Sequence, residues 1–458
     1  MLVKVLLISP INRSYVVMPS LGLGYIASVL RENNHEVKIL NCIKEKMTFN
    51  SFLEYVIKNK CDVYAFQMFS YDLNPVKKHL GIIKRCYPDS VTIVGGYHPS
   101  GDPEGVLKYL DRADFGFVSE AEIGFPILLN ELSGRNPDLS IVPNLIYRSG
   151  QQYKTNSIKL VEVLDSIPFP AWDLIDPNEY PESPHGGFAK SFPTAPIIIT
   201  RGCPLKCTFC SGGSITVKVR KRSIENVISE IKYLKQEFGV NDFLIEDENF
   251  TLHKPLLKEF CDTVINENVD ITWSGPSGVS LVTLTLDMLK LMEKSGCHSL
   301  AVGVEFGSQR MHDLTKKGLS LEKIREKMEL FKSINIRATG FFLFGIPGET
   351  RDEIMQTIEL AKELPISRAQ FNNFMPLPGS EIYKDLKKKN YNFNYDNYFV
   401  HDVAFVQEGF TRKEMKWLQR RAYLEFYLRP KIAIALIKDI TSLKHLYRLI
   451  KRFIDALR

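Results

Sequence analysis

The stretch PIIITRGCPLKCTFCSGG, residues 196–213, joins a short apolar run to three closely spaced cysteines. The run at 196–200 is β-branched and is typical of a buried strand. Cys203, Cys207 and Cys210 follow it directly. In parallel β/α folds the loops after the carboxyl ends of the strands carry the chemistry, so we expect the three thiols at the functional face.

The spacing Cys-x3-Cys-x2-Cys is one ligand short of a complete site. Three thiolates cannot fill the four positions of a tetrahedral zinc or bind all four irons of a 4Fe–4S cluster. In an iron–sulfur cluster the missing ligand leaves one iron open to a substrate or cofactor, whereas zinc would need a distant ligand such as His253. A non-catalytic zinc or iron–sulfur protein is the alternative from a different functional class. The other cysteines are scattered, without CxxC spacing, at 42, 61, 86, 261 and 297.

Length and composition place the chain among globular proteins. It has 458 residues, which favours two or three domains, and a net charge of +6. No apolar run approaches the roughly 20 residues that span a bilayer. The first residues, MLVKVLLISPINRS, are typical of a strand and a turn rather than of a signal peptide. The sequence therefore predicts a cytosolic protein with reduced thiols, which favours metal or redox chemistry for the clustered cysteines.

Strand and helix patterns alternate through two parts of the chain, which predicts an α/β fold. Residues 1–133 contain five strand-like runs and are predicted to form a flavodoxin-like domain that binds ligands at the carboxyl edge of its sheet. Residues 134–195 are rich in Pro, Asp, Ser and Gly and are predicted to be a connector. Residues 196–385 contain six β/α units, enough for a partial (β/α)6 barrel, and 386–458 are predicted to be helical.

The cysteine loop, with Phe209 before its last cysteine, resembles the signature of the radical S-adenosylmethionine (SAM) enzymes. The resemblance implies that Cys203, Cys207 and Cys210 hold a 4Fe–4S cluster whose open iron is chelated by the amino and carboxylate groups of SAM. It also implies that reduction of the cluster cleaves SAM to a 5′-deoxyadenosyl radical. An external electron donor such as flavodoxin or ferredoxin is then expected.

Two other strand ends resemble the same family. IEDENF, residues 245–250, ends the second barrel strand, where the resemblance places Asp247 and Glu248 near the amino group of the bound methionine. VGVEFGSQ, residues 302–309, resembles the fourth-strand segment and places Glu305 near the ribose or the methionine.

The last two barrel strands also end in segments that resemble the family. FGIPGET, residues 344–350, is similar to the fifth-strand turn that lies against adenine. There Gly345, Ile346 and Gly348 are expected to allow close approach of the backbone. PLPGS, residues 376–380, is similar to a common ending of the sixth strand.

The front domain resembles the cobalamin-binding domain that precedes many such barrels, through PSLGLGYIASVLRENNHEVKIL (19–40) and VGGYHPSGDPEGVL (94–107). Gly95, Gly96 and His98 follow its fourth strand, at the expected cofactor edge. Many cobalamin domains carry a DxHxxG loop whose histidine ligates cobalt, and this motif is absent here. The resemblance therefore implies a corrinoid that binds without a protein imidazole.

These resemblances imply an enzyme that methylates an unactivated carbon of a small-molecule or lipid-like substrate, because methyl transfer gives the corrinoid a clear role. A cyclase, an oxidoreductase or a rearrangement enzyme of the same family is the alternative. A radical methylthiotransferase is a further alternative, but it needs three N-terminal cysteines, the first just after strand one, where this chain reads SPINRS.

The C-terminal segment LKHLYRLIKRFIDALR, residues 443–458, places apolar residues on one helical face and basic residues on the other. Residues 411–458 hold thirteen Lys and Arg against four Asp and Glu. The helix is expected either to dock on the barrel or to lie on an anionic membrane surface. Nucleic acid is not an expected partner, because no recognition fold accompanies the charge.

Overall fold

The computed structural model describes residues 2–13, 17–181, 189–216, 218–399, 402–438, 440, 446–447 and 450–451. The chain divides into two compact units, each described here by itself. Unit 1 comprises Met1–Tyr180, Cys210–Lys221 and Leu377–Asp396. Unit 2 comprises Pro181–Phe209, Arg222–Pro376 and Asn397–Arg458.

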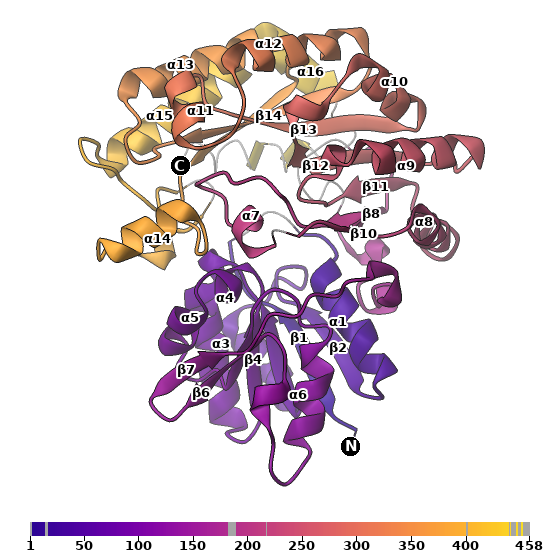
Figure 1. The fold of residues 1–458 in the computed structure, drawn as a ribbon, viewed down its shortest axis with the longest axis vertical. Helices are drawn as coiled ribbons and strands as arrows, with labels where there is room; N and C mark the ends of the chain where they lie inside the picture. Colours follow the sequence, from indigo (N-terminus) through magenta and orange to yellow (C-terminus); the bar gives the residue numbers. More distant parts are fainter. Residues whose placement is uncertain are drawn as a thin grey trace. The chain divides into compact units, whose positions relative to one another are not determined.

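Unit 1 is built on a seven-stranded sheet in the order β2-β1-β3-β4-β5-β6-β7 (Figure 1). Its strands are β1 (Lys4–Ser9), β2 (Glu36–Asn41), β3 (Val63–Gln67), β4 (Val91–Gly95), β5 (Phe115–Phe117), β6 (Leu145–Ser149) and β7 (Gln152–Thr155). The first five are parallel, and their order is that of flavodoxin-like folds, so the predicted front domain is confirmed.

Helices cover both faces of this sheet because its strand residues alternate between two buried clusters. Leu6 and Ile8 of β1 belong to one cluster, and Val5 and Leu7 belong to the other. The helices of unit 1 are α1 (Leu21–Glu32), α2 (Phe49–Lys58), α3 (Leu73–Cys86), α4 (Tyr97–Gly101), α5 (Pro103–Tyr109), α6 (Gly124–Leu132), α7 (Gly212–Ile215) and α14 (Glu381–Lys388); unit 1 also includes the short β10 (Arg220–Lys221).

Residues 134–180 of the predicted connector, 134–195, are part of unit 1. β6 and β7 lie within it and extend the sheet as an antiparallel hairpin that turns at Gly150, where φ is +63°. Beyond the hairpin, Ser28 donates to the carbonyl of Phe169 at 2.6 Å, which holds this segment on α1. The Pro-rich composition obscured a short alternating run that completes the sheet edge.

Unit 2 contains six parallel strands in the order β15-β14-β13-β12-β11-β8. They are β8 (Thr194–Ile197), β11 (Asp242–Ile245), β12 (Thr272–Val279), β13 (Cys297–Glu305), β14 (Arg337–Phe344) and β15 (Arg368–Asn373); β9 (Thr200–Arg201) follows β8. The first and last of the six strands lie at opposite ends of the described sheet, so the predicted partial (β/α)6 barrel is confirmed.

Helices follow the barrel strands as the sequence predicts, and Figure 1 shows α10, α12 and α13 on the outer side of β13 and β14. The helices of unit 2 are α8 (Ile224–Phe238), α9 (Lys254–Asn266), α10 (Leu286–Lys294), α11 (Gln309–Leu314), α12 (Leu321–Glu329), α13 (Arg351–Glu363), α15 (Arg412–Tyr427) and α16 (Pro430–Lys438). The predicted helical C-terminal region is thus confirmed for α15 and α16. Most of the predicted amphipathic segment 443–458 lies outside the described residues.

Candidate active site

The cysteine loop lies between β9 and α7, after the first barrel strand, as predicted. Cys203 and Cys207 are half-buried, Cys210 is exposed, and none of the three forms a disulfide. Cys203 and Cys207 belong to unit 2, whereas Cys210 belongs to unit 1. Within the described part of the chain, no three His, Cys, Asp or Glu side chains are gathered closely enough to hold a metal ion.

Four of the five remaining cysteines do not offer competing ligands. Cys42, Cys61, Cys261 and Cys297 are buried, and burial raises the pKa of each thiol, to about 12 for Cys42 and Cys261. A metal ligand must be a thiolate, so these side chains behave as small core residues. This also argues against a second cluster in the N-terminal domain, which the methylthiotransferase alternative requires.

Asp247 anchors the strand that leads into the cysteine loop. Its carboxylate accepts hydrogen bonds from the backbone N–H of Ile199 at 2.7 Å and from the N–H and hydroxyl of Thr200, both at 2.6 Å. Burial raises the pKa of Asp247 to about 7, against the opposing effect of these hydrogen bonds. Both oxygens of Asp247 are therefore engaged with the strand that leads into the cysteine loop. The neighbouring Glu248 is half-buried.

The cysteine loop is held against the end of the fourth barrel strand. The N–H of Thr208 donates to the carbonyl of Thr315 at 3.0 Å. The ring of Phe209 meets that of Phe306 edge to face, with the centroids 6.1 Å apart. The ammonium of Lys317 lies 5.9 Å from the centroid of the Phe209 ring. The predicted residue Phe209 is thus placed beside the segment that follows β13.

Glu305 forms an ion pair that the sequence did not reveal. Its Oε1 lies 2.8 Å from Nζ of Lys317, and the two side chains are 13% and 15% exposed. Glu305 has a φ of +68° and stands at a shift in the pairing of β13 with β14. A left-handed backbone at a residue other than glycine costs about 1–3 kcal/mol and is typical of functional sites. Lys317 lies twelve positions after Glu305, with no motif to connect them.

The fifth-strand turn directly follows β14, where it was predicted. Gly345 and Gly348 have φ values of +81° and +87°, which favour glycine at both positions. A Cβ at Gly345 would also lie 2.6 Å from Cε of Met415. Ile346 is buried between the two glycines. The N–H of Gly345 donates to Oε2 of Glu349 at 2.5 Å, and burial raises the pKa of this carboxyl to about 8.

The predicted cofactor edge of unit 1 comprises Gly95, the last residue of β4, and Gly96 and His98, which follow this strand. Gly96 has a φ of +107°, and a Cβ there would lie 2.7 Å from the carbonyl oxygen of Met68. His98 is only 2% exposed, and its Nδ1 lies 3.0 Å from the hydroxyl of Ser70. Burial lowers the pKa of His98 to about 4, so the ring is neutral. It is a packed core histidine in this structure and does not stand at the exposed edge.

Two aromatic rings stand at this edge, and the sequence analysis did not single them out. Phe69 follows β3 and Tyr97 follows β4, directly after Gly95 and Gly96. Their rings stack with centroids 5.7 Å apart and planes 16° apart, and the residues are 38% and 41% exposed. Such a flat apolar surface at the carboxyl edge of a parallel sheet is a chemically suitable place for a planar macrocycle.

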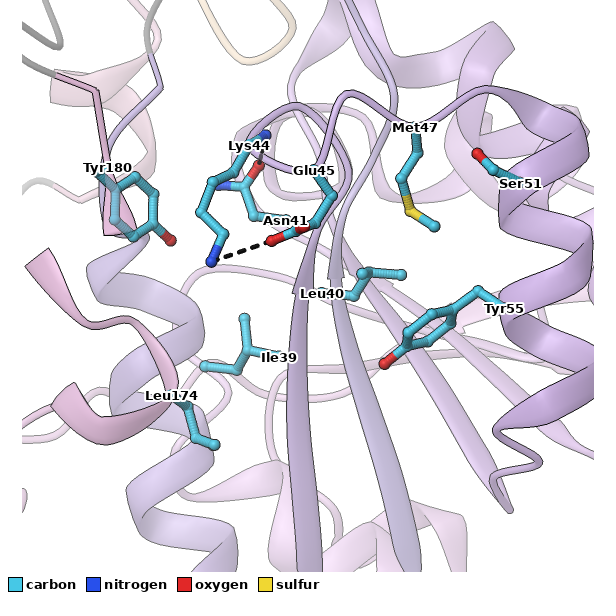
Figure 2. A pocket seen from close by; sticks show the side chains of 10 residues that line it. All are labelled: Ile39, Leu40, Asn41, Lys44, Glu45, Met47, Ser51, Tyr55, Leu174 and Tyr180. Atoms are coloured by element: carbon cyan, nitrogen blue, oxygen red, sulfur yellow. Dashed lines mark hydrogen bonds and ion pairs between the residues drawn. The ribbon is translucent and has the colours of Figure 1, made fainter. Parts of the chain in front are cut away.

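A separate pocket of about 350 Å3 lies at the carboxyl end of β2 (Figure 2). Figure 2 shows Lys44 beside Asn41 and Glu45, with Tyr180 on the other side of the lysine. Lys44 is paired with Glu45 at 3.1 Å and with Glu179. Its charge is therefore already compensated, so the pocket offers no vacant site for an anion.

Comparisons with known proteins agree with this arrangement. The pattern of the radical SAM superfamily matches residues 197–361, and that of the B12 binding domain matches residues 10–129. An uncharacterized methyltransferase of Pyrococcus horikoshii is 31% identical, with 99% of this chain and 98% of that protein covered. The cytidylyl-2-hydroxyethylphosphonate methyltransferase of Streptomyces wedmorensis is 27% identical over 81% of this chain and 78% of its own length.

Two further comparisons widen the range of related chemistry. The anaerobic magnesium-protoporphyrin IX monomethyl ester cyclase of Rubrivivax gelatinosus is 23% identical over 96% of this chain and 79% of its own length. The radical SAM methyltransferase TsrM of Kitasatospora setae, solved with cobalamin and a [4Fe-4S] cluster, superimposes with a TM-score of 0.71. At 16% identity, covering 85% of this chain and 78% of TsrM, that likeness shows a shared fold.

Proposed function

Because the chain belongs to the radical SAM superfamily, in the group that carries a B12-binding domain, we propose that this enzyme transfers a methyl group to an unactivated carbon of a small molecule. The observation that carries the proposal is the pairing of two sites in one chain. A Cys-x3-Cys-x2-Cys loop follows the first barrel strand, and a glycine and aromatic edge ends the sheet of a B12-binding domain. The methyltransferase from Pyrococcus horikoshii, similar over almost its whole length, supports methyl transfer.

The residues of the cysteine loop and of the segment that follows β13 suit the cluster and SAM. Cys203, Cys207 and Cys210 supply the thiolates, and a cluster bound there supplies the electron that cleaves SAM. The carboxylate of Glu305 and the ammonium of Lys317 together complement the amino and carboxylate groups of a methionine. Side chains that stand 13% and 15% exposed hold such a zwitterion with little competition from water.

The residues of unit 1 suit a corrinoid, which carries the methyl group when bound. Phe69 and Tyr97 offer a flat apolar face, and Gly95 and Gly96 let the backbone approach closely. His98 is buried and hydrogen-bonded to Ser70, which supports binding without a protein imidazole.

A test that needs no substrate separates methyl transfer from the alternatives. Enzyme reconstituted anaerobically with iron, sulfide and hydroxocobalamin is incubated with a reductant and SAM labelled in its methyl group. We expect 5′-deoxyadenosine and S-adenosylhomocysteine as products. The amount of label on the extracted corrinoid should match the amount of S-adenosylhomocysteine. Cys203→Ala should abolish 5′-deoxyadenosine formation, because it removes a cluster ligand.

Two other outcomes of this test have different consequences. If 5′-deoxyadenosine forms but no label reaches the corrinoid, methyl transfer is refuted and cyclisation is favoured, the chemistry of the related cyclase of Rubrivivax gelatinosus. If a fully loaded cluster gives no 5′-deoxyadenosine, radical SAM chemistry itself is refuted.

The proposal includes two partners outside the site: an external reductant of the flavodoxin or ferredoxin class, and an anionic membrane surface. None of the described helices is long and apolar enough to cross a membrane. Surface contact is supported by Leu428, Ile434 and Ile437, which are 67%, 54% and 65% exposed on or beside α16. The C-terminal surplus of Lys and Arg at 411–458 complements anionic lipid.

Flotation with liposomes tests the membrane contact. Full-length protein should float with anionic but not with neutral liposomes, and added salt should weaken the binding. Removal of 443–458 should abolish flotation and leave the melting temperature nearly unchanged. A lowered melting temperature, with no flotation of the full-length protein, would show instead that the segment docks on the protein.

A further inference from the structure

We propose that Gln407, in the C-terminal region, is a positioning residue for the SAM-binding turn at 345–349. Its side-chain amide pairs with one edge of the turn. Nε2 donates to the carbonyl of Glu349 at 2.8 Å, and Oε1 accepts from the N–H of Gly348 at 2.8 Å. Gln407 is only 8% exposed, so water competes poorly for these two hydrogen bonds.

The turn needs such partners because its own sequence leaves it flexible. Gly345 and Gly348 both adopt positive φ, and glycine has more backbone conformations to lose than any other residue. A turn with two glycines therefore loses more conformational entropy on ordering than a turn without glycine. Its peptide groups must therefore be fixed from outside if they are to meet a ligand in one geometry.

The observed hydrogen bonds fix the turn from several sides. Glu349 accepts from the N–H of Gly345 at 2.5 Å, which closes the turn from within. Arg310 donates to the carbonyl of Gly348 at 2.7 Å. Gln407 secures the remaining edge, the N–H of Gly348 and the carbonyl of Glu349. Loss of its amide would leave both of those backbone groups without these partners.

Other contacts show that the C-terminal region is built onto this junction. Met415 of α15 lies so close to Gly345 that a Cβ there would be 2.6 Å from its Cε atom. Arg351, the first residue of α13, pairs with Glu414 and donates to the carbonyl of Gly409. The segment 407–415 thus contacts the β14–α13 junction through van der Waals packing, hydrogen bonds and an ion pair. We infer that it belongs functionally to the SAM site.

The inference rests on the proposed binding of SAM at this turn, and it predicts a specific loss of affinity. Gln407→Met keeps the length of the side chain and removes both hydrogen bonds. The dissociation constant for SAM should rise about tenfold. A tenfold change corresponds to about 1.4 kcal/mol, which is near the net contribution of one hydrogen bond. Hydrogen exchange of the turn amides should also become faster, because the turn opens more often.

Tyr427→Phe is the matched control. The Tyr427 hydroxyl donates to the carbonyl of Ala369 at 2.8 Å and accepts from its N–H at 3.1 Å. Tyr427, like Gln407, thus links the C-terminal region to the backbone through two side-chain hydrogen bonds, but these bonds lie near the start of β15. Both variants should lower the melting temperature, whereas only Gln407→Met should weaken SAM binding and speed exchange at the turn.

Binding is measured by equilibrium dialysis of labelled SAM with anaerobically reconstituted enzyme, with the cluster oxidised so that SAM is not cleaved. If Gln407→Met does not fold, Gln407→Asn, whose shorter amide can keep one of the bonds, takes its place. Equal SAM affinity and equal turn exchange in the variant and the wild type would overturn the inference. Equal weakening by Tyr427→Phe would also overturn it. If the wild type itself does not bind SAM, the proposed function fails instead.

Discussion

Replacing Arg220 by methionine should strongly destabilise unit 1, because Arg220 neutralises a buried carboxylate. Its two terminal nitrogens each lie 2.7 Å from an oxygen of Glu120, and the two side chains are 3% and 9% exposed. Arg220 also donates to the carbonyl of Val161 at 2.8 Å, and Glu120 accepts from the N–H of Val161 at 2.9 Å. The pair joins the segment that begins at Cys210 to the rest of unit 1.

The magnitude follows from what Arg220→Met leaves behind. Removing one partner of a buried ion pair costs about 3–5 kcal/mol, because the remaining charge is uncompensated. At about 2–4 °C per kcal/mol for a unit of this size, the melting temperature should fall by about 10 °C. Combining it with Glu120→Gln removes the buried charge, so the double variant should recover much of the loss.

Lys218→Met is the control on the same segment. Lys218 pairs with Glu162, and the two side chains are 59% and 62% exposed. An exposed pair contributes about 0–1 kcal/mol, so this variant should melt within about 4 °C of the wild type.

Scanning calorimetry of the anaerobically prepared protein measures the transition of unit 1, and iron analysis after reconstitution measures the cluster. Because Cys210 lies in the segment that Arg220 anchors, the iron content should fall for Arg220→Met and not for Lys218→Met. The reasoning is refuted if the two variants lose equal stability, or if the double variant is less stable than Arg220→Met.

Three further predictions concern buried groups. Burial lowers the pKa of His79 and His98 to about 4, so both rings are neutral in the folded protein. The free energy of unfolding should therefore be highest above about pH 6.5 and should fall toward pH 4, by about 3 kcal/mol per histidine. Urea midpoints across this range measure the loss, and His79→Phe should reduce it. Gly96→Ala should abolish retention of hydroxocobalamin in gel filtration and lower the free energy of unfolding by about 2 kcal/mol or more. The new methyl group would collide with the carbonyl oxygen of Met68, and alanine is strained at the positive φ of this position. Asp247→Asn should lower the melting temperature and the iron content. The N–H groups of Ile199 and Thr200 each donate to an oxygen of Asp247, and in asparagine one of these oxygens is replaced by an NH2 group, which cannot accept. Unchanged iron content would contradict this prediction.

The sequence by itself determined the parts of this protein that depend on local spacing. The three thiols lie within eight positions of one another, so their common loop needed no tertiary information. Alternating strand and helix periods predicted the six barrel strands, and the glycines at 345 and 348 marked a turn whose positive φ few other residues adopt. The same kind of local signal placed Gly96 at the edge of the front sheet.

Only the tertiary structure decided which side chains meet. Gln407 reaches the turn across 58 and 59 positions of chain, and no periodicity or motif marks an isolated glutamine in a loop. Asp247 and Glu248 are adjacent acids, and only the packed strand shows that Asp247 is engaged by Ile199 and Thr200. The hydrophobic effect that drives packing is non-directional, so the sequence pattern indicates what is buried. The pairing of polar groups within the packed chain depends on geometry that forms only when distant segments come together.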